Sequence, residues 1–484
     1  NMSKTVAIVG GGIIGGGWAA RFLLNGWKVR IFDPDPQSER KIGEVLENAR
    51  RSLPGLSDVE MPSPGCISFC ETIEDTVLDA SFIIEAVPER LEIKQSVYEQ
   101  IENKNNRSII ASSTSGIMPS DLQSKMKYPE RLIVAHPFNP VYLLPLVELV
   151  GGSKTDDKFI TTAREILTGL GMHPLHCRVE IEGFLSDRLQ EALWREALWL
   201  LKDNVATAEE LDAAIAYGPG LRWAQMGTMQ TFHLAGGEGG MRAMLAMFGP
   251  CLKWPWTKLM DVPELTPDFV EMVGDQCETQ SSQFSPRELE KIRDNNLVSI
   301  MRALKGQNWG AGRTLNEYDV RAKNASLRVP DKSLNTGCRV VPLDWTDYNG
   351  HMNEARYLQA FCDATDRFMA EIGCDENYIK TGGSYFTAET HIRHIEEVLA
   401  GSKILIQTTC LESTKKKIHI FHEMIGEKGQ LLASGEHLLL HVSLATRKVS
   451  EASETIQEEL KRLSNEQANI PTPGGVGRHV GQPK

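Results

Sequence analysis

A histidine and a glutamate twelve residues apart are the first candidates for chemistry. His136 ends an apolar run in RLIVAHPF, and Glu148 lies within a second run, LVELV. An imidazole suits proton removal from a secondary alcohol because its unperturbed pKa is near working pH. A carboxylate on the other ring nitrogen would orient the imidazole and stabilise its charged form. Alone, such a pair is more often a satisfied core histidine and a surface acid.

A glycine-rich segment near the start of the chain offers a binding site. VAIVGGGIIGGGWAARF places Gly10, Gly12 and Gly15 in GxGxxG spacing, after an apolar run and at the start of a helical one. These glycines would permit a tight turn, close approach of a pyrophosphate and close helix packing. Asp33, about 20 residues on, can bind a ribose 2′-hydroxyl and would repel a 2′-phosphate. We therefore predict NAD rather than NADP; the alternative is a strand-to-helix turn without a ligand.

A third candidate is the acid that opens DYNGHMNEARY, residues 347–357. The segment resembles the signature of hotdog thioesterases, which carry an acid in a turn before a long central helix. The resemblance implies that Asp347 is the base or the nucleophile, with His351 and Asn353 lining the site. Backbone N–H groups at the helix start would stabilise the oxyanion. The alternative is that Asp347, Asn349 and Gly350 form only a turn and a helix cap.

The elements that position these residues follow from periodicity. Short apolar runs alternate with helix-length segments over residues 1–182, which predicts an α/β Rossmann domain with a parallel, doubly wound sheet. Residues 183–322 change to a helical period and predict an all-α domain. Within it, SPRELEKI predicts a capping box in which Ser285 and Glu288 occupy the first turn.

The remainder of the chain predicts a linker, a third domain and a tail. Residues 323–334 are polar and hold a proline without a clear period. Residues 335–455 read as strand, long helix and further strands, which is the outline of an α+β hotdog fold. Residues 456–484 are expected to form a partly disordered tail, since the last stretch is rich in Gly, Pro and polar residues. The whole chain is thus predicted to be multidomain.

Composition narrows the classes of partner. The formal charge of -12 argues against nucleic acid or an anionic membrane, because both need a basic face. No apolar stretch reaches the roughly 20 residues that span a bilayer. Nine cysteines without a CxxC pair read as reduced thiols, so a cytoplasmic location is expected. The histidines of the third domain read as ordinary sheet residues, and no metal site is predicted.

Several strings resemble the 3-hydroxyacyl-CoA dehydrogenase family over roughly the first 320 residues. They are GGGIIGGG, FIIEAVPE, ASSTSG, HPFNP and LVELV. The resemblance implies that His136 is the general base, Glu148 its orienting partner and Ser115 a hydroxyl that contacts the substrate oxygen. Glu85 and Lys94 are also expected to bind NAD.

One position departs from that family. Where the family usually has asparagine in GFIVNRL-like segments, this chain has Asp187 in GFLSDRL. A carboxylate there could repel an acyl-CoA carbonyl oxygen or attract a cation. Other strings look like L-carnitine dehydrogenases, namely EALWREALWLL, YGPGLRWAQMGTM, HLAGGEGGMR and FGPCLKWPWTKL. This resemblance implies oxidation of a 3-hydroxy acid that carries a trimethylammonium group.

Tryptophans are enriched in the predicted helical domain, which holds six of them: Trp194, Trp199, Trp223, Trp254, Trp256 and Trp309. Aromatic faces attract a quaternary ammonium by about 0.5–2 kcal/mol each. We take Trp223 with Phe248 or Trp254 as candidates for such a cage and Arg222 as a candidate for the substrate carboxylate. The alternative is that several tryptophans only fill the core or a dimer interface.

A fused family joins a carnitine dehydrogenase to a betainyl-CoA thioesterase, and resemblance to it implies two substrates, L-carnitine and betainyl-CoA. In that family a separate enzyme converts 3-dehydrocarnitine to betainyl-CoA. Three alternatives remain: a 3-hydroxyacyl-CoA dehydrogenase with an acyl-CoA thioesterase, a dehydrogenase with a non-catalytic hotdog module, and a crystallin-like structural protein. Both component families pair subunits, so a homodimer is expected.

Overall fold

The computed structural model describes residues 4–258, 264–323 and 333–482. The chain divides into two compact units. The first contains the described parts of 1–52 and 62–318, and the second those of 53–61 and 319–484. None of the described helices is both long and apolar enough to cross a membrane.

The first unit is built on a sheet whose order, over the described residues, is β3-β2-β1-β4-β5-β6-β7-β8. The strands are β1 (Thr5–Val9), β2 (Lys28–Phe32), β3 (Ile67–Phe69), β4 (Phe82–Glu85), β5 (Ile109–Ser112), β6 (Leu132–Pro137), β7 (Leu146–Gly151) and β8 (His173–Cys177). β1, β4 and β5 are buried along their whole length, as expected of strands covered on both faces. The Rossmann-like prediction is confirmed.

One strand departs from the all-parallel prediction, because β7 runs antiparallel to β6. Only eight residues separate these strands, whereas a parallel crossover needs a dozen or more. The antiparallel register sets His136 directly opposite Glu148. The twelve-residue spacing is therefore that of a cross-strand pair.

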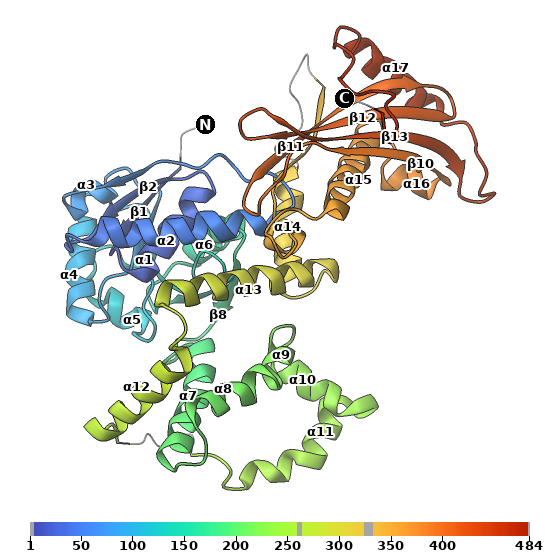
Figure 1. The fold of residues 1–484 in the computed structure, drawn as a ribbon. Helices are drawn as coiled ribbons and strands as arrows, with labels where there is room; N and C mark the ends of the chain where they lie inside the picture. Colours follow the sequence, from blue (N-terminus) through green and yellow to red (C-terminus); the bar gives the residue numbers. More distant parts are fainter. Residues whose placement is uncertain (1–3, 259–263, 324–332, 483–484) are drawn as a thin grey trace. The chain divides into compact units, whose positions relative to one another are not determined.

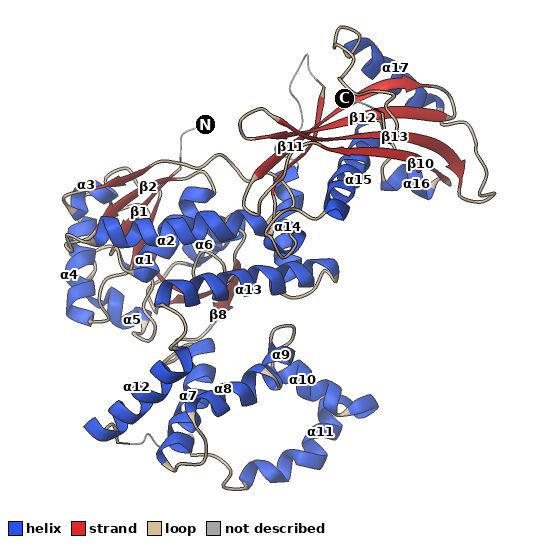
Figure 2. Ribbon diagram, in the orientation of Figure 1, coloured by secondary structure: helices blue, strands red, loops and turns tan. Residues whose placement is uncertain are grey.

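Helices accompany this sheet (Figures 1 and 2). They are α1 (Ile13–Leu24), α2 (Ser38–Ser52), α3 (Ile73–Val77), α4 (Leu91–Glu102), α5 (Pro119–Leu122) and α6 (Asp157–Gly169). The residues between α1 and β1 form the glycine-rich loop. It lies at the end of β1, where the strand order turns to β2 on one side and β4 on the other. Open sheets of this kind bind ligands at such a switch point.

The rest of the first unit is helical, as predicted. Its helices are α7 (Ser186–Lys202), α8 (Ala208–Ala216), α9 (Pro219–Trp223), α10 (Thr228–Ala235), α11 (Gly240–Phe248), α12 (Pro267–Ser281), α13 (Pro286–Gly306) and α14 (Ala311–Lys323), which continues into the second unit. The predicted capping box is confirmed: the Ser285 hydroxyl accepts from the Glu288 N–H, and the Glu288 carboxylate accepts from the Ser285 N–H.

The second unit carries a fully antiparallel sheet in the order β10-β13-β12-β11-β9. The strands are β9 (Leu334–Val340), β10 (Gly383–His394), β11 (Lys403–Ser413), β12 (Lys417–Gly426) and β13 (Leu431–Ser443). The long helix α15 (Glu354–Glu371) packs on it, and α16 (Glu376–Lys380) precedes β10 (Figure 2). The antiparallel-sheet thioesterase-like fold is confirmed.

The second unit extends beyond the boundary expected at residue 455. Helix α17 (Glu454–Glu466) buries Ile456, Leu460 and Leu463 in one cluster with Phe368 of α15. Apolar residues at this spacing form one face of a helix, so the segment packs rather than forming a tail. The predicted linker at 323–334 lies mostly outside the described residues.

Candidate active sites

The glycine-rich loop has the geometry of a dinucleotide cradle. Gly10 has φ +111, and a Cβ there would lie 2.3 Å from the Ala86 carbonyl oxygen. A Cβ on Gly15 would lie 1.8 Å from the Gly10 carbonyl oxygen, so only glycine allows this packing. A Cβ on Gly12 would meet nothing within 4 Å, which marks the side open to a ligand. The three predicted glycines thus have distinct roles that fit a pyrophosphate at the start of α1.

Asp33 lies against this loop at the end of β2. One carboxylate oxygen accepts from the Gly11 N–H, and the other accepts from the Asp35 N–H at 2.7 Å. These contacts hold a negative charge next to the loop. A neutral 2′-hydroxyl suits that position, whereas a 2′-phosphate meets repulsion.

Glu85, the last residue of β4, and Lys94 of α4 form a buried ion pair of 2.7 Å. Both are almost without exposure, and Glu85 also accepts from the hydroxyls of Tyr98 and Ser112. The network fixes the end of β4 beside the glycine loop. Their contact with NAD stays a prediction.

The second predicted pair meets across β6 and β7. His136 Nδ1 lies 3.0 Å from Glu148 Oε1, and both residues are buried. Glu148 Oε2 accepts from the N–H groups of Leu185 and Ser186, at the start of α7. The glutamate therefore orients the imidazole and also anchors the helix, and it leaves Nε2 as the nitrogen available for proton transfer.

Asp187 follows that anchor in the first turn of α7. Its Oδ2 lies 3.4 Å from His136 Nε2, and its side chain is 27% exposed. Burial raises the pKa of Asp187, an effect that nearby His136 opposes and Glu148 reinforces. The residue that departs from the dehydrogenase pattern is thus brought to the candidate catalytic nitrogen.

Ser115 lies in the loop after β5. Because β5 runs parallel to β6, this loop is at the end of the sheet that carries His136. Its backbone N–H donates to Glu89 at 3.3 Å, and the neighbouring Thr114 hydroxyl donates to the same carboxylate. Glu89 was not among the predicted residues. Its position within FIIEAVPE was the signal that could have pointed to it.

The proposed aromatic cage is not assembled by any described contact. Trp223, Phe248 and Trp254 are each between 40% and 54% exposed. Among the described residues, Trp254 has a ring contact with Trp256 at 5.0 Å. Arg222 lies beside Trp223 in α9. The roles of these four residues remain predictions.

Asp347 stands in a tightly bonded turn before α15. Its Oδ1 accepts from the N–H groups of Asn349 and His351, at 2.8 and 3.2 Å. Gly350 has φ +77, a conformation that favours glycine. Asn353 is the N-cap of α15 and accepts from the Ala355 N–H. The turn-and-cap alternative is therefore present in the structure, and it leaves the second Asp347 oxygen without a described bond.

Two further contacts hold this turn. The Met352 N–H donates to the Val398 carbonyl, and the Asn353 N–H donates to that of Trp345. The Trp345 ring receives the Arg339 guanidinium at 3.8 Å and that of Arg356 at 5.9 Å. Sequence reasoning missed Trp345. Its side chain is buried, and its backbone carbonyl holds Asn353, so it helps to fix the turn. His351 Nε2 lies 3.2 Å from Glu397.

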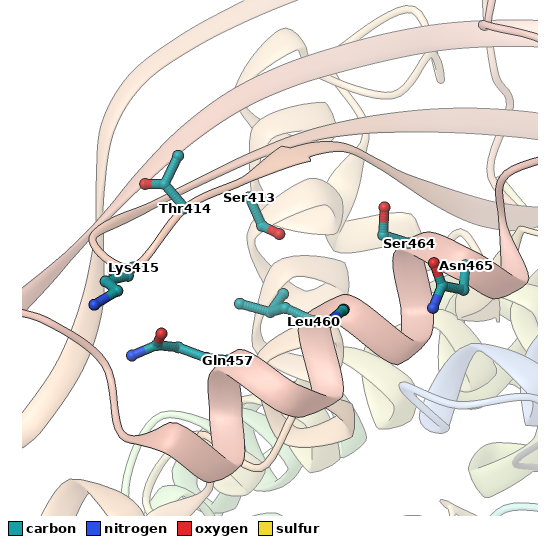
Figure 3. Close-up of a pocket in the computed structure, with 8 residues that line it drawn as sticks. Ser413, Thr414, Lys415, Gln457, Leu460, Ser464 and Asn465 are labelled. Atoms are coloured by element: carbon teal, nitrogen blue, oxygen red, sulfur yellow. The ribbon is translucent and has the colours of Figure 1, made fainter.

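A polar cavity of about 310 Å³ lies elsewhere in the second unit (Figure 3). It opens between α17 and the β11–β12 turn and contains none of the predicted site residues. Its lining is Ser413, Thr414, Lys415, Gln457, Leu460, Lys461, Ser464 and Asn465. Among the described residues, no group of three or more His, Cys, Asp or Glu side chains is placed to hold a metal ion.

Three protein-family models match parts of the chain. Residues 5–180 match the NAD binding domain of 3-hydroxyacyl-CoA dehydrogenase, and residues 183–261 match its C-terminal domain. Residues 341–460 match the thioesterase-like superfamily.

A relative from Ruegeria pomeroyi, an L-carnitine dehydrogenase/betainyl-CoA thioesterase, is 55% identical over 99% of both chains. This chain belongs to the L-carnitine dehydrogenase/betainyl-CoA thioesterase family. An L-carnitine dehydrogenase from Oceanobacillus iheyensis is 52% identical to this chain. The match covers 62% of this chain and 97% of the relative.

A solved structure supports the dehydrogenase half of the family assignment. It is that of 5-formyl-3-hydroxy-2-methylpyridine 4-carboxylic acid 5-dehydrogenase, an NAD+ dependent dismutase, with 29% identity and a TM-score of 0.54. It covers 63% of this chain and 99% of that chain. In this member of the L-carnitine dehydrogenase/betainyl-CoA thioesterase family, the first unit is therefore the NAD-dependent part.

Proposed function

We propose that this protein oxidises L-carnitine to 3-dehydrocarnitine with NAD and hydrolyses betainyl-CoA to glycine betaine and CoA. The observation that carries the proposal is the 55% identity over both halves to a relative bearing both activities in its name. The site geometry supports it, because each half presents a polar group suited to its reaction. Both substrates carry a trimethylammonium group, so one chain would serve two steps on related molecules.

In the oxidation, NAD supplies the hydride acceptor when it is bound. His136 accepts the hydroxyl proton at Nε2, since Nδ1 faces Glu148. Glu148 stabilises the resulting imidazolium and is itself held by two N–H groups of α7. Ser115 contacts the substrate oxygen from the loop after β5. The contacts of His136 and Glu148 support the roles proposed for these two residues.

In the hydrolysis, the Asp347 carboxylate activates water or attacks the thioester carbonyl. Its turn is fixed by two N–H donors to Oδ1, so the carboxylate is held in place before the reaction. The start of α15 offers partial positive charge for the developing oxyanion. His351 lies beside this turn and lines the proposed site.

The expected homodimer is also part of the proposal. Helices of the first unit leave large apolar side chains exposed, among them Leu189 at 71%, Tyr217 at 86% and Met229 at 72%. Where such side chains lie together, they are candidates for an interaction surface. A second copy of the chain would cover them, and light scattering after gel filtration tests this. A cytoplasmic location remains a prediction from the sequence.

The activities are tested with purified full-length protein. NADH formation with L-carnitine, and CoA release from betainyl-CoA, are the expected results. Formation of NADH with 3-hydroxybutyryl-CoA but not with L-carnitine would contradict the dehydrogenase assignment. Absence of CoA release would contradict the thioesterase assignment.

A further inference from the structure

The surroundings of His136 place a negative charge and an aromatic ring beside the nitrogen that receives the proton. Asp187 Oδ2 lies 3.4 Å from Nε2. The Phe138 ring centroid lies 4.7 Å from that of the imidazole, and that of buried Phe184 lies 5.8 Å away. Phe138 is partly exposed. A substrate at Nε2 therefore meets a carboxylate and one accessible aromatic ring.

The position of a cation bound here follows from covalent geometry. A hydroxyl hydrogen-bonded to Nε2 lies about 2.8 Å from it. In a 3-hydroxy-4-ammonio acid, three bonds of about 1.5 Å join the hydroxyl oxygen to the ammonium nitrogen, so these atoms are at most about 4 Å apart. The cation is thus confined to within about 7 Å of Nε2. Asp187 lies inside that limit.

The tryptophans of α7 lie further along their helix, and the described ring contacts of His136 are with Phe138 and Phe184. Trp194 follows Asp187 by seven residues, which is a rise of about 10 Å at 1.5 Å per residue. Glu148 is also unsuited, because one oxygen faces His136 and the other accepts two N–H groups, and the residue has no exposure. Asp187, at 3.4 Å from Nε2, retains access to solvent.

We propose that the Asp187 carboxylate and the Phe138 ring form the subsite that receives the quaternary ammonium group of the substrate. The proposal rests on the proposed carnitine oxidation and names the residues that make it selective. A trimethylammonium group has no N–H to donate, so it pairs through charge and through methyl contacts with a ring face. A neutral 3-hydroxy acid would leave the partly buried carboxylate uncompensated. Asp187 therefore selects cationic substrates against neutral ones of the same shape.

The test compares L-carnitine with its carbon isostere, 3-hydroxy-5,5-dimethylhexanoate, in which a quaternary carbon replaces the nitrogen. We expect full-length wild type to prefer L-carnitine. Asp187→Asn should lower kcat/KM for L-carnitine by roughly 30-fold or more, as for loss of one partner of a desolvated charge pair. In the same variant, kcat/KM for the isostere should stay unchanged or rise. Phe138→Leu should lower kcat/KM for L-carnitine by a smaller factor and leave kcat/KM for the isostere unchanged.

An unchanged KM for NAD serves as the control that the first unit of each variant is folded, and unchanged betainyl-CoA hydrolysis as the control for the second unit. An equal loss for both substrates in Asp187→Asn would overturn the subsite, while the proposed function would stand. Failure of the wild type to oxidise L-carnitine would instead overturn the proposed function. Asp187→Glu, which keeps the charge, should retain more of the preference than Asp187→Asn.

Discussion

At the residue scale, we predict that the charge of Asp33 sets the choice between NAD and NADP. Asp33→Asn keeps an oxygen that can accept from the loop N–H groups but removes the charge that repels a 2′-phosphate. The ratio of kcat/KM for NADP to that for NAD should rise at least about tenfold, because a like-charge contact is removed. Initial rates with both cofactors at saturating L-carnitine measure it. An unchanged ratio would remove Asp33 from cofactor selection.

At the residue scale, sequence reasoning identified the polar groups but not all their contacts. Resemblance pointed to His136 and Glu148, and the structure joins them across two strands. Asp187 was noticed as a departure from a pattern, yet its 3.4 Å approach to Nε2 depends on how α7 starts beside β7. The ring contact of Phe138 follows from packing, for which the string HPFNP contains no signal.

At the element scale, the direction of β7 and the role of α17 were the features that sequence missed. A short connection between two apolar runs was the available sign that β7 reverses. In α17, polar residues outnumber apolar ones. Because the stretch after it is rich in Gly and Pro, residues 456–484 were together predicted to form a tail. Burial of Ile456 and Leu463 shows that a single apolar stripe was enough to dock the helix.

Helix α17 gives a matched pair of variants. Leu460 is 1% exposed in the shared cluster, whereas its neighbour Lys461 is exposed. Leu460→Ala should lower the free energy of unfolding of the second unit by about 2–4 kcal/mol, from lost transfer energy and a cavity. Lys461→Ala should change it by less than about 0.5 kcal/mol. Urea unfolding monitored by loss of thioesterase activity measures both. Equal effects would show that α17 does not stabilise the unit.

Two buried histidines between α15 and the sheet predict acid sensitivity of the second unit. Burial lowers the pKa of His437 to about 4, and burial together with His437 lowers the pKa of His422. The unfolded chain takes up protons below about pH 6.5, whereas the folded state resists them. Stability should therefore fall as pH drops from about 6.5 towards 4, by up to about 1.4 kcal/mol per unit for each histidine.

Urea midpoints at pH 7.5 and 5.5 measure this slope for the full-length protein. His437→Gln removes one titrating group and should reduce the difference between the two midpoints. His391, which lies on the edge strand β10 and is partly exposed, gives the control His391→Gln, with the difference retained. A His437→Gln variant with the wild-type difference would exclude this histidine as a source.

At the scale of the whole molecule, the chain places two reactions in separate compact units. Each unit has its own buried clusters, one around the Rossmann-like sheet and others between α15, α17 and the second sheet. Two folds in one chain were predictable from sequence, because the helical period of residues 183–322 separates two different strand patterns. That segment 53–61 belongs to the second unit was not predictable from sequence. Its contacts there, such as that of Asp58 with Arg339, depend on tertiary packing.

Separate cores predict separable activities. His136→Asn should lower L-carnitine oxidation by several orders of magnitude, because the proposed general base is lost, and leave betainyl-CoA hydrolysis unchanged. Asp347→Asn should have the reverse effect; unlike Asp347→Ala, it keeps an oxygen for the Asn349 and His351 N–H groups and so preserves the turn. Both rates are measured on the same preparation. If either substitution lowered both activities while the unfolding midpoint stayed constant, the two sites would be coupled, and the two units could not be treated as independent catalysts.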